Sequence, residues 1–342
     1  MKTFKPLLLA AALAASATLA IAASPATPAS PDLVSSQFLH ALNSGTGPAI
    51  NTLTPAQARQ VMIDAQNSVK VDLSGIDVSN KTIEQDGITV PITIVRPQGA
   101  TGTLPVFMFF HGGGWMVGDF QTHERLVCDL VVQSGAVAVF VNYTLSPEAR
   151  YPVAINQAYA ATKWVAAHGN EIGVDGSRLA VVGNSSGGNM AAVVSLMAKN
   201  KQGPAIRFQG LMWPATDSYF NDGSYNAYRE GYYLTRPAQK WFWDAYTKDP
   251  KQRNEIYASP LRASADQLKG LPPALIQVAQ FDVLRDEGEA YGRKLDAAGN
   301  EVTTIRYNGT IHDFGVLNAL AGDAPTKAAT RQLANELQAR LK

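Results

Sequence analysis

Two patterns of hydrophobic residues divide the chain. From residue 88 to 94 apolar residues alternate with others, which predicts a half-buried strand, and Pro91 within it favours an edge position. Further along, short apolar runs predict buried strands at 104–110, 136–143, 178–183, 207–213, 274–281 and 302–307. Stretches that read as helices separate several of these runs, at 122–134, at 152–168 and from about 186. This alternation predicts one α/β domain, whose mostly parallel central sheet is covered by helices on both faces.

Two segments outside this alternation are expected to be helical. Between 31 and 71 we predict two short helices, and Thr54, Pro55 and Gln57 have the spacing of a capping box at the start of the second. Between Asp217 and Tyr246 the chain carries ten aromatic residues. These aromatic side chains either pack on the sheet as part of a helical insertion or line an apolar pocket beneath a lid.

The N-terminus has the pattern of a cleavable signal peptide. Lys2 and Lys5 precede an apolar run at 7–22 that ends in small residues, so we predict a signal peptide at 1–22, with cleavage after Ala22 or Ala23. The alternative is a membrane anchor, but the run is shorter than the roughly 20 residues that span a bilayer. The mature chain, 23–342, is therefore expected to be periplasmic or secreted and to have no stable membrane span.

Composition excludes some partners and leaves others open. The 29 basic and 28 acidic residues, with no basic run, argue against nucleic-acid binding. Cys128 is the only cysteine, so an intramolecular disulfide is excluded. His123-Glu124 lacks the second histidine of a zinc-binding helix, and no motif implies a metal or cofactor. The sequence is compatible with either a monomer or a homodimer.

Ser185 is the candidate nucleophile. It lies in Gly183-Asn184-Ser185-Ser186-Gly187, a Gly-x-Ser-x-Gly pattern where a predicted strand meets a helix, and the glycines allow a tight turn that lifts the hydroxyl clear of the sheet. About 70 residues earlier, His111 and three glycines follow the strand at 104–110. Bare N–H groups there suit the oxyanion of an ester intermediate. The rival interpretations are a flexible turn or a phosphate loop, and the Gly-Lys-Ser/Thr of a phosphate loop is absent.

The base and the acid are predicted from the order of the elements. His312 follows the last strand, and Asp282 follows the strand at 274–281, at the carboxyl edge of the sheet where active sites lie. Asp286 and Glu287 fall in the next helix, where stabilisation of the helix dipole explains them. The order Ser185, Asp282, His312 is that of the α/β-hydrolase triad.

From about residue 104 to its end the chain resembles the hormone-sensitive-lipase-like carboxylesterases, also called bacterial family IV esterases. The resemblance rests on His111-Gly-Gly-Gly-Trp115, Asn142-Tyr-Thr-Leu-Ser-Pro-Glu148, Gly183-Asn-Ser-Ser-Gly-Gly188, Asp282-Val-Leu-Arg-Asp-Glu287 and His312-Asp-Phe314. It implies an α/β-hydrolase fold at 23–342, with a helical cap contributed by about 31–71 and 217–255. It also implies that the N–H groups of Gly113, Gly114 and Ser186 form the oxyanion hole, while His111 only orders its loop.

Three residues depart from the family pattern. Asn184 and Ser186 replace the usual aspartate and alanine beside the nucleophile, and the extra hydroxyl of Ser186 is expected to affect the acyl pocket. Thr144 replaces an arginine, which puts the ion pair of that arginine in doubt.

The function expected from these residues is hydrolysis of short- to medium-chain carboxylic esters through an acyl-enzyme, with a small-molecule ester as substrate and no cofactor. Two alternatives stay open. An amidase or lactonase would use the same triad, and a binding protein without catalysis could share the fold.

Overall fold

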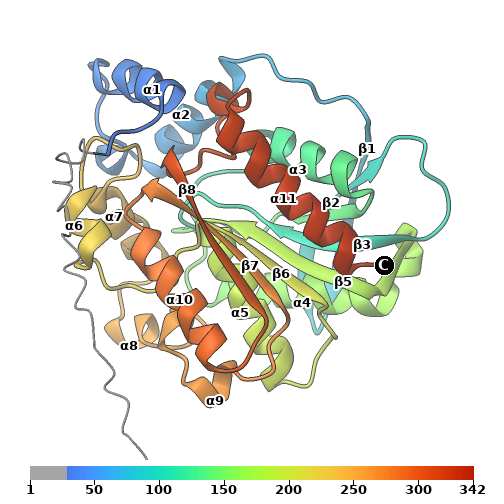
Figure 1. Ribbon diagram of the computed structural model, residues 1–342. Coiled ribbons are helices and arrows are strands. Elements are labelled where there is room, and N and C mark those ends of the chain that lie inside the picture. The colour runs from blue at the N-terminus through green and yellow to red at the C-terminus, as the bar shows by residue number, and fades with distance from the viewer. Residues whose placement is uncertain (1–28) are drawn as a thin grey trace, which may run out of the picture. The chain divides into compact units, whose positions relative to one another are not determined.

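A single eight-stranded β-sheet organises the part of the chain that the structure describes, residues 29–342 (Figure 1). The structure is a computed structural model, and the predicted signal peptide at 1–22 lies outside the described residues. The strand order is β1-β2-β4-β3-β5-β6-β7-β8. The strands are β1 (Ile76–Gln85), β2 (Ile88–Pro97), β3 (Leu104–Phe110), β4 (Val137–Val141), β5 (Val174–Asn184), β6 (Phe208–Met212), β7 (Ala274–Phe281) and β8 (Val302–Ile311).

The sheet is parallel from β4 to β8, whereas β2 is antiparallel to both β1 and β4. The predicted edge position of the strand that contains Pro91 is therefore wrong. β1, which is largely polar and exposed, pairs along the outside of β2, with Thr82 opposite Pro91. Pro91 lies just before the first residue that pairs with β4, so its missing N–H interrupts no bond of that ladder.

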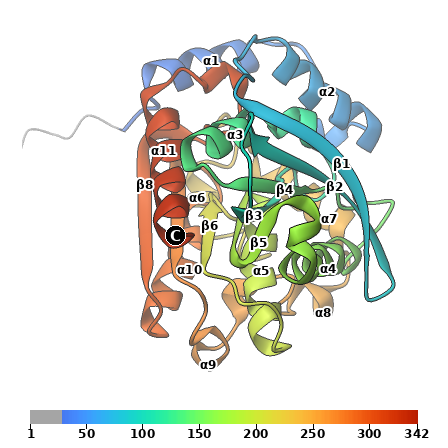
Figure 2. The same cartoon turned by 90° about the vertical axis from the view of Figure 1, so that its right-hand side faces the viewer.

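Alternate residues of β3 enter two separate cores. Val106, Met108 and Phe110 point to one core, whereas Phe107 and Phe109 point to the other. Helices α4 (Val153–His168), α5 (Ser186–Asn200) and α10 (Arg285–Ala297) cover the first face, and α3 (Phe120–Ser134) and α11 (Ala324–Arg340) cover the second (Figure 2). The side chains of the central strands are buried on both faces, as the continuous apolar runs predict.

The two segments outside the alternation are helical. The N-terminal segment forms α1 (Leu33–Asn43) and α2 (Pro55–Asn67), and the capping box of Thr54 and Gln57 is confirmed. The later segment contains α6 (Gly223–Ala227), α7 (Arg236–Tyr246) and α8 (Pro250–Arg253); α9 (Ala265–Leu268) follows it.

The two helical segments contact each other. The Phe38 and Tyr233 rings meet edge to face with centroids 5.8 Å apart, and Asn43 Nδ2 donates to the Gly231 carbonyl at 3.1 Å. Residues far apart in the chain thus lie together at the end of the sheet where β5 and β7 terminate (Figures 1 and 2). Among residues 29–342, no helix combines the length and hydropathy needed to span a bilayer.

Candidate active site

Ser185 occupies a strained turn between β5 and α5. Its φ of 54° lies in the left-handed region, which costs energy for any residue other than glycine. The turn needs both flanking glycines. A Cβ on Gly183 would overlap the Gly187 carbonyl, and a Cβ on Gly187 would overlap the Phe110 carbonyl of β3. The Gly-x-Ser-x-Gly pattern therefore follows from backbone packing, and it holds the Ser185 side chain at the carboxyl edge of the sheet.

Asp282 and His312 are brought together by the pairing of β7 with β8. Phe281 lies opposite Ile311 in that ladder, so the residues that follow each of them are neighbours. His312 Nδ1 lies 2.7 Å from Asp282 Oδ2, and His312 Nε2 lies 3.0 Å from Ser185 Oγ. The three predicted residues thus form one hydrogen-bonded chain, and each is at most 5% exposed.

The charges around His312 favour its protonated form. Burial alone would lower its pKa, but the carboxylates of Asp282 and Asp313 outweigh burial and raise the pKa above the ordinary value of 6.5. Asp282 Oδ1 accepts the Leu284 N–H at 2.9 Å, which fixes the carboxylate toward the imidazole. The arrangement lets His312 accept a proton from a hydroxyl at Ser185 and hold it.

The glycine loop after β3 presents unpaired donors. The N–H groups of Gly113, Gly114 and Ser186 have no hydrogen-bond partner among residues 29–342. Gly113 and Gly114 have φ values of 104° and 59°. A Cβ on Gly113 would overlap the Val117 carbonyl, and one on Gly114 would overlap the Phe242 side chain of α7. Bare backbone at these positions leaves N–H groups free to bind an oxyanion.

The His111 ring lies inside the loop, and its hydrogen bonds and ring contacts within residues 29–342 are to residues outside the triad. Its ring stacks on Tyr143 at 4.2 Å and on Phe140 at 5.3 Å, and its Nδ1 lies 2.8 Å from the Gly112 carbonyl. Burial lowers the pKa of His111 to about 4. A neutral, stacked imidazole that holds a loop carbonyl fits the ordering role implied by the resemblance.

The three departures from the family pattern each have a partner. Ser186 Oγ accepts the Trp115 N–H at 3.2 Å and is buried, so its hydroxyl is directed toward the glycine loop. Asn184 Oδ1 accepts the Gly112 N–H at 2.9 Å. The hydroxyl and N–H of Thr144 bond with the side chain of Gln157 on α4.

Glu148 has an ion-pair partner that sequence reasoning missed. Arg59 of α2 binds Glu148, and no local pattern marks this contact because 89 positions separate the two residues. Glu287 is a second missed residue. The helix dipole does not account for it: Glu287 is 3% exposed and its Oε1 accepts the Thr216 N–H at 2.6 Å, at the start of the aromatic insertion.

The aromatic insertion packs against the glycine loop. Trp115 stacks on Tyr246 with centroids 4.1 Å apart and meets Trp243 edge to face at 4.9 Å. Phe242 lies against Gly114. Tyr219, in contrast, is 56% exposed. Packing therefore explains several of these aromatic residues, and the same residues form one wall beside the predicted oxyanion hole.

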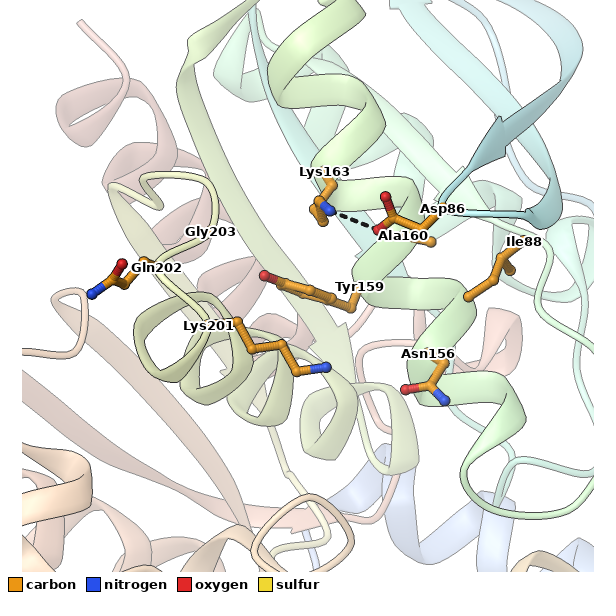
Figure 3. A pocket seen from close by; sticks show the side chains of 9 residues that line it. All are labelled: Asp86, Ile88, Asn156, Tyr159, Ala160, Lys163, Lys201, Gln202 and Gly203. Carbon is orange, nitrogen blue, oxygen red and sulfur yellow. Dashed lines mark hydrogen bonds and ion pairs between the residues drawn. The ribbon is translucent and has the colours of Figure 1, made fainter.

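A separate surface hollow lies over α4, with a volume of about 410 Å³ (Figure 3). None of its lining residues belongs to the predicted site, and its Lys163 is already paired with Asp86 at 2.6 Å. Within residues 29–342, no cluster of three or more His, Cys, Asp or Glu side chains could hold a metal ion.

Known proteins are similar to this chain in sequence and fold. A family model described as α/β hydrolase fold matches residues 107–316. The carboxylic ester hydrolase LipN of Mycobacterium tuberculosis is 38% identical over 78% of this chain and 71% of its own length. An ethyl acetate hydrolase of Pseudomonas putida is 33% identical over 70% of this chain and 76% of its own length.

A solved structure similar to this chain is also that of an esterase. A thermostable esterase from Pseudomonas putida is 60% identical, with a TM-score of 0.91 over 93% of this chain and 99% of that one. The predicted fold class is confirmed. The chain belongs to the hormone-sensitive-lipase-like carboxylesterase family, bacterial family IV, of the α/β-hydrolase superfamily.

Proposed function

We propose that the chain is an exported serine carboxylesterase that hydrolyses short- to medium-chain esters through an acyl-enzyme. One observation carries the proposal: the unbroken hydrogen-bond chain from Ser185 Oγ through His312 to Asp282, at 3.0 and 2.7 Å. A serine hydroxyl is a weak nucleophile until a positioned base accepts its proton, and this chain supplies that base.

In the first half-reaction, Ser185 Oγ attacks the ester carbonyl carbon while its proton passes to His312 Nε2. Asp282 holds the imidazole through Nδ1 and stabilises its charge. The carbonyl oxygen becomes negative and is bound by the N–H groups of Gly113, Gly114 and Ser186. When the C–O bond to the alcohol breaks, His312 gives its proton to the leaving oxygen.

In the second half-reaction, water attacks the acyl carbon while His312 takes one of its protons. The bond to Ser185 Oγ then breaks, His312 returns the proton to that oxygen, and the carboxylic acid leaves. Every step uses groups of this chain and water.

Substrate size and export rest on separate observations. The wall of Phe242, Trp115 and Tyr246 beside the glycine loop favours small acyl groups, and a relative named ethyl acetate hydrolase agrees with this choice. The charged and apolar pattern of residues 1–22 supports export. An amidase or lactonase would use the same triad, but the relatives compared above are named as ester hydrolases.

The test is hydrolysis of p-nitrophenyl esters of increasing chain length by residues 23–342, beside Ser185→Ala. We expect activity on short chains and a loss of about 10⁶ in kcat for the variant. A folded wild type that is inactive on every ester would contradict the proposal and direct attention to amides or lactones. Export is tested separately, by the N-terminal mass of the chain recovered outside the cytoplasm, which should begin at Ala23 or Ser24.

A further inference from the structure

A second carboxylate lies beside His312, on the side that faces Ser185. Asp313 Oδ2 is 3.7 Å from His312 Nε2, the same nitrogen that contacts Ser185 Oγ. Asp313 is 5% exposed. The mechanism above uses Asp282 on the opposite nitrogen and gives Asp313 no part.

Asp313 is held rigidly at this place. Its Oδ1 accepts Trp213 Nε1–H at 2.7 Å and Asn184 Nδ2–H at 3.0 Å. Its φ of 58° is left-handed, a conformation that aspartate, asparagine and glycine tolerate better than other residues do. The Trp213 ring is itself packed, because a Cβ on Gly315 would overlap it. Two side chains, from β5 and from the loop after β6, thus fix the direction of one carboxylate.

Apart from His312, the groups described around Asp313 carry no positive charge that could pair with its carboxylate. Trp213 and Asn184 are neutral donors. His123 is buried, and burial, with the nearby His111, lowers its pKa to about 3, so it is uncharged at neutral pH. Tyr233 also lies near Asp313. Burial, and to a smaller extent the negative charge of Asp313, raises the pKa of the Tyr233 hydroxyl above its ordinary value.

Arg125, which binds the loop that follows Asp313, does not supply the missing positive charge. Arg125 Nη1 is bound to Asp129, and its Nη2 donates to the Gly315 and Val316 carbonyls. A buried carboxylate without a cationic partner is costly. Among the described residues, the imidazolium of His312 is the group that can meet this requirement, and Asp282 is the other carboxylate that faces it.

We propose that Asp313 is a positioning residue for ester hydrolysis that acts through His312, by stabilising the imidazolium from the side that faces Ser185. This inference rests on the proposed function. The imidazolium forms when Ser185 gives up its proton, so a fixed negative charge near Nε2 assists that step. Asn184 makes the arrangement workable, because an aspartate at 184 would place a second carboxylate against Asp313 Oδ1.

The experiment measures kcat/KM for p-nitrophenyl acetate between pH 5 and 9, where the acid limb reports the base of the free enzyme. The variants are Asp313→Asn and Asp313→Gly, both suited to a left-handed backbone. Removing the carboxylate should move the midpoint of the acid limb to lower pH by about one unit. Trp213→Phe is the matched control: it removes one donor but keeps the carboxylate, so its limb should not move to lower pH.

Wild-type midpoints in both Asp313 variants would overturn the proposal, even if kcat fell, since a purely structural role lowers the rate without moving the limb. If turnover of the variants is too slow, the pH dependence of Ser185 labelling by a fluorophosphonate gives the same midpoint. A wild type that hydrolyses no ester would overturn the proposed function, and this proposal with it. An active wild type with an unmoved limb would overturn this inference alone.

Discussion

Arg59 and Glu148 form a bidentate ion pair, with Nη1–Oε1 and Nη2–Oε2 distances of 2.9 and 2.7 Å, that joins helix α2 to the loop after β4. The same guanidinium donates from Nε to the Met116 carbonyl at 2.8 Å and from Nη2 to the Ser146 carbonyl at 3.1 Å. Met116 comes two residues after Gly114. Arg59 therefore links the N-terminal helices to the predicted oxyanion hole.

We predict that Arg59→Met is more harmful than Glu148→Gln. The carboxylate is half exposed, so the ion pair itself contributes at most about 1 kcal/mol to the free energy of unfolding. Loss of Arg59 also leaves two carbonyl groups without their donor, at about 1–3 kcal/mol, and loosens the glycine loop. We expect kcat to fall about tenfold, equivalent to about 1.4 kcal/mol, measured by steady-state kinetics and urea unfolding. Lys163→Met, which breaks a comparable ion pair with Asp86, is the control. Equal effects of all three variants would contradict a connection from Arg59 to the glycine loop.

A methyl group at residue 114 should abolish most activity. Gly114→Ala strains a left-handed backbone and forces its Cβ into Phe242, so the loop must move. We expect kcat/KM to fall at least about 10²-fold, the effect of losing one oxyanion donor. Gly99→Ala is the matched control, since Gly99 has a φ of 66° but open space around it. Both variants carry about 1–2 kcal/mol of strain; a comparable fall in kcat/KM for Gly99→Ala would refute a local effect.

Acid should destabilise the fold through two buried histidines. Burial lowers the pKa of His111 to about 4 and that of His123 to about 3, whereas an unfolded histidine titrates near 6.5. The unfolded chain therefore binds more protons below pH 6.5, and stability falls as pH falls from there toward 4, by up to about 1.4 kcal/mol per unit for each histidine. Urea unfolding between pH 7 and 4.5 measures the slope. His123→Phe should reduce it by up to one proton, and an unchanged slope would count against the neutral state of His123.

Glu287 should act in the opposite direction. Burial raises its pKa well above the ordinary value of 4.5, so the folded chain keeps a proton that the unfolded chain releases. The contribution of Glu287 to the free energy of unfolding is complete below about pH 4.5 and is lost as pH rises toward the pKa of the folded state. Glu287→Gln, which resembles the protonated form, should gain stability relative to wild type between pH 5 and 9. A constant difference between the two proteins over that range would show that folding does not raise the pKa of Glu287.

The parts of the site that follow from strand order could be predicted. Asp282 and His312 each come directly after a strand, and neighbouring parallel strands end at the same edge of a sheet. Contacts that depend on distant segments could not. Arg59 lies on a helix before the sheet begins, and the partners of Asp313 come from β5 and from the loop after β6. The edge strand β1 was also missed, because its exposed polar residues lack the alternation that marked β2.

His312 is carried by the last strand of the sheet. Among the described residues β8 pairs with β7 alone, and Ile311, the residue before His312, makes the final contact of that ladder. Strands at the margin of a sheet open more readily than central strands do. Local fraying of β8 would withdraw the base from Ser185 while β3 and β5 stay buried. We therefore expect activity to be lost on heating at a lower temperature than the one at which the whole fold melts, which a comparison of residual activity with thermal unfolding measures.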